Sequence, residues 1–180
     1  EGRLRTEPVE PMLDRRQQIH GRWVLGGEDA LFVLLVHPAF AKHLGAWEMG
    51  LHRLADLLAW LRDREFDWPR VRQLLDESGV RTAAWATLRW LELVAGEHAP
   101  PVVRSMQSDL EPGPARRKWI DYWLRNDLPG RTSGRRWTRL VGYSLFLHDT
   151  ARDALRAARG RRRASRRAKE DMATFRDLHL

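Results

Sequence analysis

The stretch "LHRLADLLAWLRDREFDWPRVRQLLDESGVRTAAWATLRWLELVAG", residues 51–96, decides the fold because it predicts consecutive helices. The first helix is expected over about 46–64, where leucines recur at helical spacing. An apolar stripe of this kind is typical of a helix that packs one face onto a core. The stripe consists of Leu51, Leu54, Leu58 and Leu61, with Leu57 beside it.

The boundaries of the next helix are marked by side chains with strong positional preferences. Asp67 predicts an N-cap, Pro69 suits a first helical turn, and Gly79 predicts the end of that helix. A third helix is expected over about 80–95. Its apolar residues fall on one face and comprise Trp85, Leu88, Leu91 and Val94.

The rest of the chain adds further helices and little β-strand signal. Helices are expected over about 29–43, kinked at Pro38, over 102–110 and over 116–124, and in a long last helix from about 135 past 160. The stretch "QIHGRWVLGG", residues 18–27, predicts a short strand or hairpin. We therefore expect an all-α fold, a multi-helix bundle or array with a short N-terminal strand or hairpin. The nine tryptophans are interpreted mostly as core residues, and the inward side chains of 116–124 are Trp119, Ile120 and Trp123.

Composition suggests three regions: an N-terminal segment 1–27, a helical domain 28–150 and a basic C-terminal helix or tail 151–180. The net charge of +8 is located in residues 151–169, which hold nine basic residues and one acidic residue, while the remaining residues sum to zero. This segment is either a solvated helix end or a contact for an anionic partner such as nucleic acid. The polyanion-contact candidates are Arg159, Arg161, Arg162, Arg163, Arg166 and Arg167.

Several classes of protein are disfavoured by what the sequence lacks. There is no cysteine, so disulfides and thiolate metal sites are excluded. The longest apolar run covers residues 30–36, too short for a membrane span, and we expect a cytoplasmic protein. No serine-hydrolase elbow, phosphate-binding glycine loop or paired-histidine zinc motif occurs.

Three polar residues within helical segments are candidates for substrate binding. His37 follows an apolar run, while His52 and Asp56 are four residues apart and share one helix face. A carboxylate beside an imidazole can orient it as a base or ligand. The alternatives are a hydrogen-bonded His37 in the core and a solvated ion pair between His52 and Asp56.

Residues 13–40 and 49–96 together resemble the uncharacterised nucleotidyltransferase family of the DNA polymerase-β-like superfamily. The likeness rests on His37 closing an apolar helix, on Asp56 inside the next helix, and on the pair Asp67-Trp68 opening the one after it. It covers about half of the chain well and the last third loosely.

The resemblance implies a protein in which an α/β core carries a Gly-Ser or Gly-Gly turn followed by Asp-x-Asp on a strand. Those carboxylates would hold Mg²⁺ and the nucleoside triphosphate, and a helical region would shape the acceptor side. This chain has no Asp-x-Asp, and its nearest forms are "DRE" at 63–65 and "DLE" at 109–111. It therefore resembles the helical C-terminal part alone, and its start without methionine agrees with a fragment.

The expected function is thus the acceptor-side or supporting part of a nucleotidyltransferase-like protein, inactive alone. No catalytic residue and no metal ligand is assigned here, and Mg²⁺ and NTP are expected only with the missing core, joined in cis. The alternative is a helical module that binds nucleic acid or another polyanion through its Arg-rich end. A third interpretation is an interaction domain whose surface tryptophans make the contact.

Overall fold

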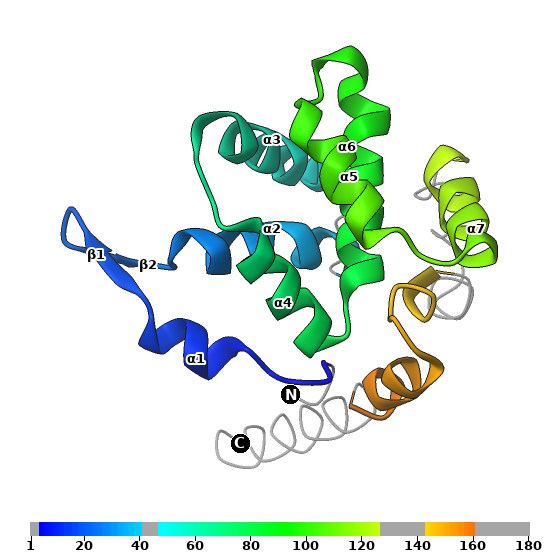
Figure 1. The fold of residues 1–180 in the computed structure, drawn as a ribbon, viewed down its shortest axis with the longest axis horizontal. Coiled ribbons are helices and arrows are strands. Elements are labelled where there is room, and N and C mark those ends of the chain that lie inside the picture. Colours follow the sequence, from blue (N-terminus) through cyan, green and yellow to red (C-terminus); the bar gives the residue numbers. More distant parts are fainter. Residues whose placement is uncertain (1–3, 41–46, 127–142, 161–180) are drawn as a thin grey trace, which may run out of the picture.

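The computed structural model describes residues 4–40, 47–126 and 143–160 and is mostly helical, with one short hairpin (Figure 1). In that hairpin, β1 (Gln17–Ile19) pairs antiparallel with β2 (Arg22–Val24). His20 and Gly21 form the turn with φ of 49° and 76°, as two-residue hairpin turns require. The predicted hairpin is confirmed. The short helix α1 (Val9–Asp14) before it was not predicted, because no apolar period marks it.

Helix α2 (Gly27–Phe40) lies at the centre of the molecule. It begins slightly before the predicted start, and Pro38 lies inside it as expected. The buried carboxylate of Asp29 in its first turn accepts two hydrogen bonds from Arg15, at 2.8 and 3.1 Å. The predicted continuation to residue 43 falls outside the described residues, as does His43.

Helices α3 (Trp47–Asp63) and α4 (Trp68–Ser78) confirm the two helices predicted from residues 46–78. The Asp67 carboxylate accepts a hydrogen bond from the Arg70 amide at 3.1 Å, and Gly79 ends α4 with φ of 70°. The stripe of α3 is centred differently from the prediction. Leu57 is fully buried between Leu54 and Leu61, whereas Leu51 and Leu58 are half-buried.

Helix α5 (Arg81–Ala95) is the second central helix and leads into the short turn η2 (Gly96–His98). Every residue from 82 to 88 is buried, so its first half is surrounded on all sides. Val94 is exposed, although it was predicted on the same helix face as Leu88 and Leu91, which are buried. The end of α5 extends beyond the helices that cover its beginning, as Figure 1 shows.

The other helices pack around α2 and α5. Helix α2 contacts α3, α4 and α5, while α5 also contacts α6 (Pro101–Leu110) and α7 (Pro114–Arg125). One continuous apolar core joins them. Its largest fully buried side chains include Leu31, Leu35, Leu57, Leu75, Leu88, Leu91, Met106, Leu110, Ile120 and Leu147.

The tryptophans are less uniformly buried than expected. Trp85 is buried, but Trp119 on α7 is exposed and Trp123 is only half-buried, so their predicted inward orientation is wrong for Trp119. Among the residues of α7, Ile120 and Leu124 are buried in the core, and Trp123 packs against it. Trp23 on the hairpin is also exposed.

The C-terminal part differs from the predicted long helix. Residues 145–150 form turns and bends, and a helix then covers 151–160. The Thr150 hydroxyl accepts a hydrogen bond from the Asp153 amide at 3.1 Å, which caps this helix. The long helix predicted from 135 is therefore interrupted, and the segments 127–142 and 161–180 lie outside the described residues. None of the described helices is both long and apolar enough to cross a membrane.

Candidate functional site

A cavity of about 420 Å³ lies between α2, the N-terminal segment and the C-terminal part. Most of its wall is apolar, and three titratable side chains interrupt that wall. An apolar cavity with a few polar groups is the usual form of a small-molecule site. Its lining comprises Leu4, Val9, Phe32, Val33, Val36, Phe40 and Ala157, together with Glu7, His37 and His148.

His37 and His148 reach this cavity from residues that are far apart in the sequence. His37 lies in the last turn of α2 and lines the cavity, and its side chain is exposed to solvent. His148 is buried and packs its ring against Phe40, with ring centroids 4.9 Å apart. The sequence singled out His37 and missed His148, because the latter was assigned to the interior of a long helix.

A clasp formed by Arg5, Thr150, Asp153 and Arg156 joins the two ends of the described chain, and Leu4 and Ala157 of the cavity wall are sequence neighbours of two of its residues. The Asp153 carboxylate accepts two hydrogen bonds from the Arg5 guanidinium, at 2.7 and 3.3 Å. Thr150 donates to it at 2.6 Å and Arg156 at 3.0 Å. The hydrogen bond from Arg5, followed by that from Thr150, outweighs desolvation and lowers the pKa of Asp153 to about 2. The clasp is therefore charged at neutral pH.

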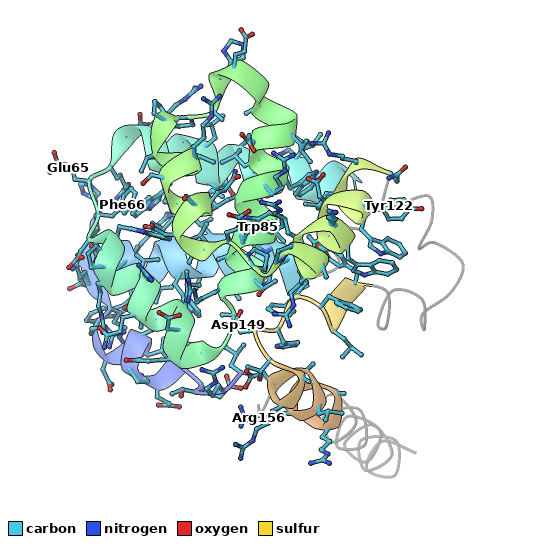
Figure 2. All side chains as sticks on the ribbon, turned by 45° about the vertical axis from the view of Figure 1, so that its right-hand side comes forward. Glu65, Phe66, Trp85, Tyr122, Asp149 and Arg156 are labelled. Carbon is cyan, nitrogen blue, oxygen red and sulfur yellow. The ribbon has the colours of Figure 1, made fainter. Side chains whose placement is uncertain are left out.

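Asp149, next to His148, caps a helix that is distant in the sequence. Val80 at the start of α5 gives no side-chain cap, and Asp149 replaces it. Its carboxylate accepts hydrogen bonds from the amides of Arg81 at 3.1 Å and Thr82 at 2.8 Å. A carboxylate at this end also complements the helix dipole. Figure 2 shows Asp149 in the connection beside the helix over 151–160, and the capping bonds hold His148 at the cavity.

His52 and Asp56 lie elsewhere on the molecule. Both are exposed on α3, and neither lines the cavity that His37 lines. Asp56 makes a long ion pair of 3.7 Å with Arg53, which is weak at an exposed position. The structure brings His37 together with His148 rather than with His52 and Asp56.

The basic C-terminal residues are described only at their beginning. Arg159 is exposed near the end of the helix over 151–160. The other polyanion-contact candidates, Arg161, Arg162, Arg163, Arg166 and Arg167, lie outside the described residues.

The acids nearest to an Asp-x-Asp pattern are positioned as structural residues. Asp63 and Glu65 are exposed at the end of α3 and just after it. Asp109 accepts a hydrogen bond from the Trp68 indole at 2.8 Å, and Glu111 pairs with Arg117. Within the described ranges, no group of three or more His, Asp or Glu side chains could hold a metal ion. These residues do not fit the Mg²⁺ site that the resemblance attributes to a catalytic core.

A second, polar cavity of about 500 Å³ lies between α5, α6 and α7. Its charged side chains largely satisfy one another. Arg89 donates to Asp121 at 2.7 Å and also pairs with Glu92. Burial opposes ionisation of Asp121, but hydrogen bonds from Arg89 and Arg125 lower its pKa. These ion pairs connect neighbouring helices, and we interpret the network as a structural contact rather than a ligand site.

Comparison with known protein families, with curated proteins and with solved structures finds no match to this chain.

Proposed function

We propose that this chain is the helical, acceptor-side part of a nucleotidyltransferase-like protein whose catalytic core lies outside these residues. The observation that carries the proposal is the hairpin β1–β2, which we infer to be the edge where that core is joined. Its chain continues almost directly into α2, so a unit docked on the hairpin would lie next to the central helix.

The hairpin presents exposed apolar side chains, and the Arg16 guanidinium contacts the ring of one of them, Trp23, at 4.7 Å from the ring centroid. All six strand residues are exposed, including Ile19 at 46%, Trp23 at 60% and Val24 at 37%. In Figure 1 it extends away from the helices. A two-stranded hairpin is marginally stable by itself, and an open strand edge readily pairs with another strand. Both properties fit an extension of the sheet of an α/β core.

The cavity gives the proposal its second support. In the proposed arrangement the core would supply the Gly-Ser turn, the Asp-x-Asp carboxylates, Mg²⁺ and NTP, which together perform phosphoryl transfer. This chain would supply His37 and the apolar wall of α2 as acceptor contacts. An acceptor suited to this wall has an apolar body and a group that can hydrogen-bond to an imidazole. His52 and Asp56 remain predicted contacts for a more extended acceptor.

The test begins with the coding sequence immediately before Glu1. We expect an in-frame Gly-Ser or Gly-Gly turn, followed about ten residues later by Asp-x-Asp, the spacing that the resemblance implies for phosphoryl transfer. The longer product should then transfer nucleotides from NTP with Mg²⁺, whereas residues 1–180 alone should not. Absence of the motif, or turnover by residues 1–180 alone, would refute the proposal.

Variants of the longer product test the two supporting observations. Trp23→Ala with Val24→Ser should weaken nucleotidyl transfer by disturbing the junction, and His37→Ala should raise the KM for the acceptor. The matched control is Val94→Ser, an equally exposed apolar residue on α5. Equal activity of the hairpin variant, the His37 variant and the control would show that neither feature serves this function.

The alternative function is a polyanion-binding module that uses the Arg-rich C-terminal segment. It is supported by Arg152 and Arg159, which are exposed on the helix leading into that segment and make no ion pair within the described part of the chain. Such binding should fall steeply with salt and be indifferent to bases. Equal affinity for inorganic polyphosphate and for oligonucleotides would support it, and no binding of either at low salt would exclude it.

A further inference from the structure

Four aromatic side chains form a cluster on the outer side of α7, called here the aromatic surface: Trp119, Tyr122, Trp123 and Phe146. Trp119 lies at its centre, with ring centroids 6.3 Å from Tyr122, 6.0 Å from Trp123 and 5.6 Å from Phe146. The rings of Trp119 and Tyr122 are nearly parallel, with an interplanar angle of 28°. The cluster thus offers adjacent ring faces from α7 and from the turn that contains Phe146.

Most of these rings remain exposed although they contact one another. Trp119 is 39% exposed, Tyr122 46% and Phe146 39%. Figure 2 shows Tyr122 on the outer side of α7, away from the central Trp85. A shallow depression is lined by Ala115, Lys118, Trp119, Tyr122 and Trp123. Exposed large apolar clusters of this kind mark interaction surfaces.

The basic residue that lines the aromatic surface favours an anionic partner. Of the four basic residues of α7, Arg116 donates to the Asp149 carbonyl, Arg117 pairs with Glu111 and Arg125 pairs with Asp121, so Lys118 is the one that remains. The Asp121 carboxylate is already occupied by Arg89 and Arg125. Lys118 lines the depression itself and makes no ion pair in the ranges that the structure describes. A cation is therefore placed beside exposed ring faces.

We propose that the aromatic surface of α7 binds single-stranded nucleic acid, with bases stacked on Trp119 and Tyr122 and a phosphate near Lys118. Aromatic rings combined with basic groups are how single strands are bound without sequence preference, because every base has a ring face. Paired bases in a duplex hide those faces, so a duplex should bind less well. This inference rests on α7 and is independent of the catalytic core proposed above and of the Arg-rich segment.

The first experiment uses the unaltered chain. Fluorescence anisotropy would follow a labelled oligouridine of about 12 nucleotides, a length within the range of known single-strand sites. The competitors are an abasic strand of equal length, a duplex, inorganic polyphosphate and a proline-rich peptide. We expect the abasic strand and the duplex to bind at least about tenfold more weakly than the oligouridine.

The second experiment uses variants with matched controls. Trp119→Ala should weaken oligouridine binding about tenfold, whereas Trp119→Phe, which keeps a ring, should stay within about threefold. Val94→Ala removes an exposed apolar side chain of α5, outside the aromatic surface, and should have no effect. Polyphosphate binding, if present, should be unchanged by Trp119→Ala.

Several results would overturn the inference. Equal binding of the abasic strand and the oligouridine would show contact through charge alone. No binding of oligouridine at about 50 mM salt, where phosphate contacts are strongest, would remove the site. Equal losses in the Trp119→Ala and Val94→Ala variants, or binding of the peptide without binding of the oligouridine, would also contradict it.

Discussion

Replacing Asp153 by asparagine keeps the size of the side chain and removes its charge, which should weaken the clasp that joins the two ends of the described chain. The carboxylate is nearly inaccessible to solvent, at 3% exposure for the residue. It receives hydrogen bonds from Arg5, Thr150 and Arg156. An asparagine can accept at one oxygen only, and its amide nitrogen would face the Arg5 guanidinium with no acceptor.

The magnitude follows from the pKa of Asp153. The folded protein lowers this pKa from 3.8 to about 2, chiefly through the hydrogen bond from Arg5. A difference of that size corresponds to about 2 kcal/mol in the free energy of unfolding. Because the folded pKa lies below the unfolded value, this contribution is fully present above about pH 4 and is lost as the pH falls toward 2.

The assay is urea unfolding followed by circular dichroism, for the wild type and Asp153→Asn, at about pH 6, 4 and 3. We expect the variant to be less stable by about 2 kcal/mol at the highest pH, with the difference shrinking at the lowest. Asp56→Asn is the control, because Asp56 is exposed and its ion pair with Arg53 is long, so its change should stay below about 0.5 kcal/mol. A difference that is the same at every pH would refute the assignment of the stabilisation to the Asp153 charge, as would a change no larger than that of the control.

Three further predictions concern a helix cap, a glycine in the left-handed region and the apolar core. Asp149→Ala should lower the unfolding free energy by about 1–3 kcal/mol in urea titrations, because two amides at the start of α5 lose their acceptor. A loss below about 0.5 kcal/mol would contradict the role of Asp149 as the cap. Gly79→Ala should lower the free energy of unfolding by about 1–3 kcal/mol in thermal unfolding, because φ is +70° and a Cβ would lie 3.2 Å from atoms of Arg5 and Asp153. The control is Gly113→Ala, where a Cβ meets nothing within 4 Å. Equal shifts in melting temperature for the two variants would disprove the argument. Leu57→Ala should lower the free energy of unfolding in urea by about 2–5 kcal/mol, whereas Leu155→Ala, at an exposed position, should leave it nearly unchanged. Similar values for the two variants would place Leu57 outside the core.

Helices and strands could be predicted where the residues that mark their ends lie close to them in the sequence. Asp67 and Gly79 mark the two ends of α4, and each acts through atoms within a few residues of itself. The hairpin was predicted from the alternation of residues 18–25, and the structure places its turn at His20 and Gly21. Local chemistry of this kind is independent of how the rest of the chain folds.

Burial was harder to predict, because helical periodicity shows which residues share a face and leaves open what covers that face. Val94 shares the face of Leu91, yet α5 extends beyond its neighbours there and leaves it exposed. Trp119 has the spacing of a core residue, but Ile120 makes the core contact and Trp119 joins the aromatic surface. These outcomes depend on the lengths and crossing of neighbouring helices.

The candidate site was half predictable. His37 was found because it interrupts an apolar run on α2. Its partner in the cavity wall, His148, could be placed only once the C-terminal part was seen to fold back. The clasp pairs residues 148 positions apart, and no spacing rule reaches that far. The short motif of Asp149, Thr150 and Asp153 was the signal available, since it resembles a helix start.

The cap that Asp149 provides for α5 has a consequence for synthesis on the ribosome. Thr82 leaves the ribosome 67 residues before the carboxylate that accepts its amide hydrogen bond. Until then, water alone solvates the leading amides of this central helix, and its first turn remains frayed. The first turn of α5 therefore waits for the synthesis of Asp149, and a chain stalled before that residue would present an unfinished α5 to chaperones and proteases.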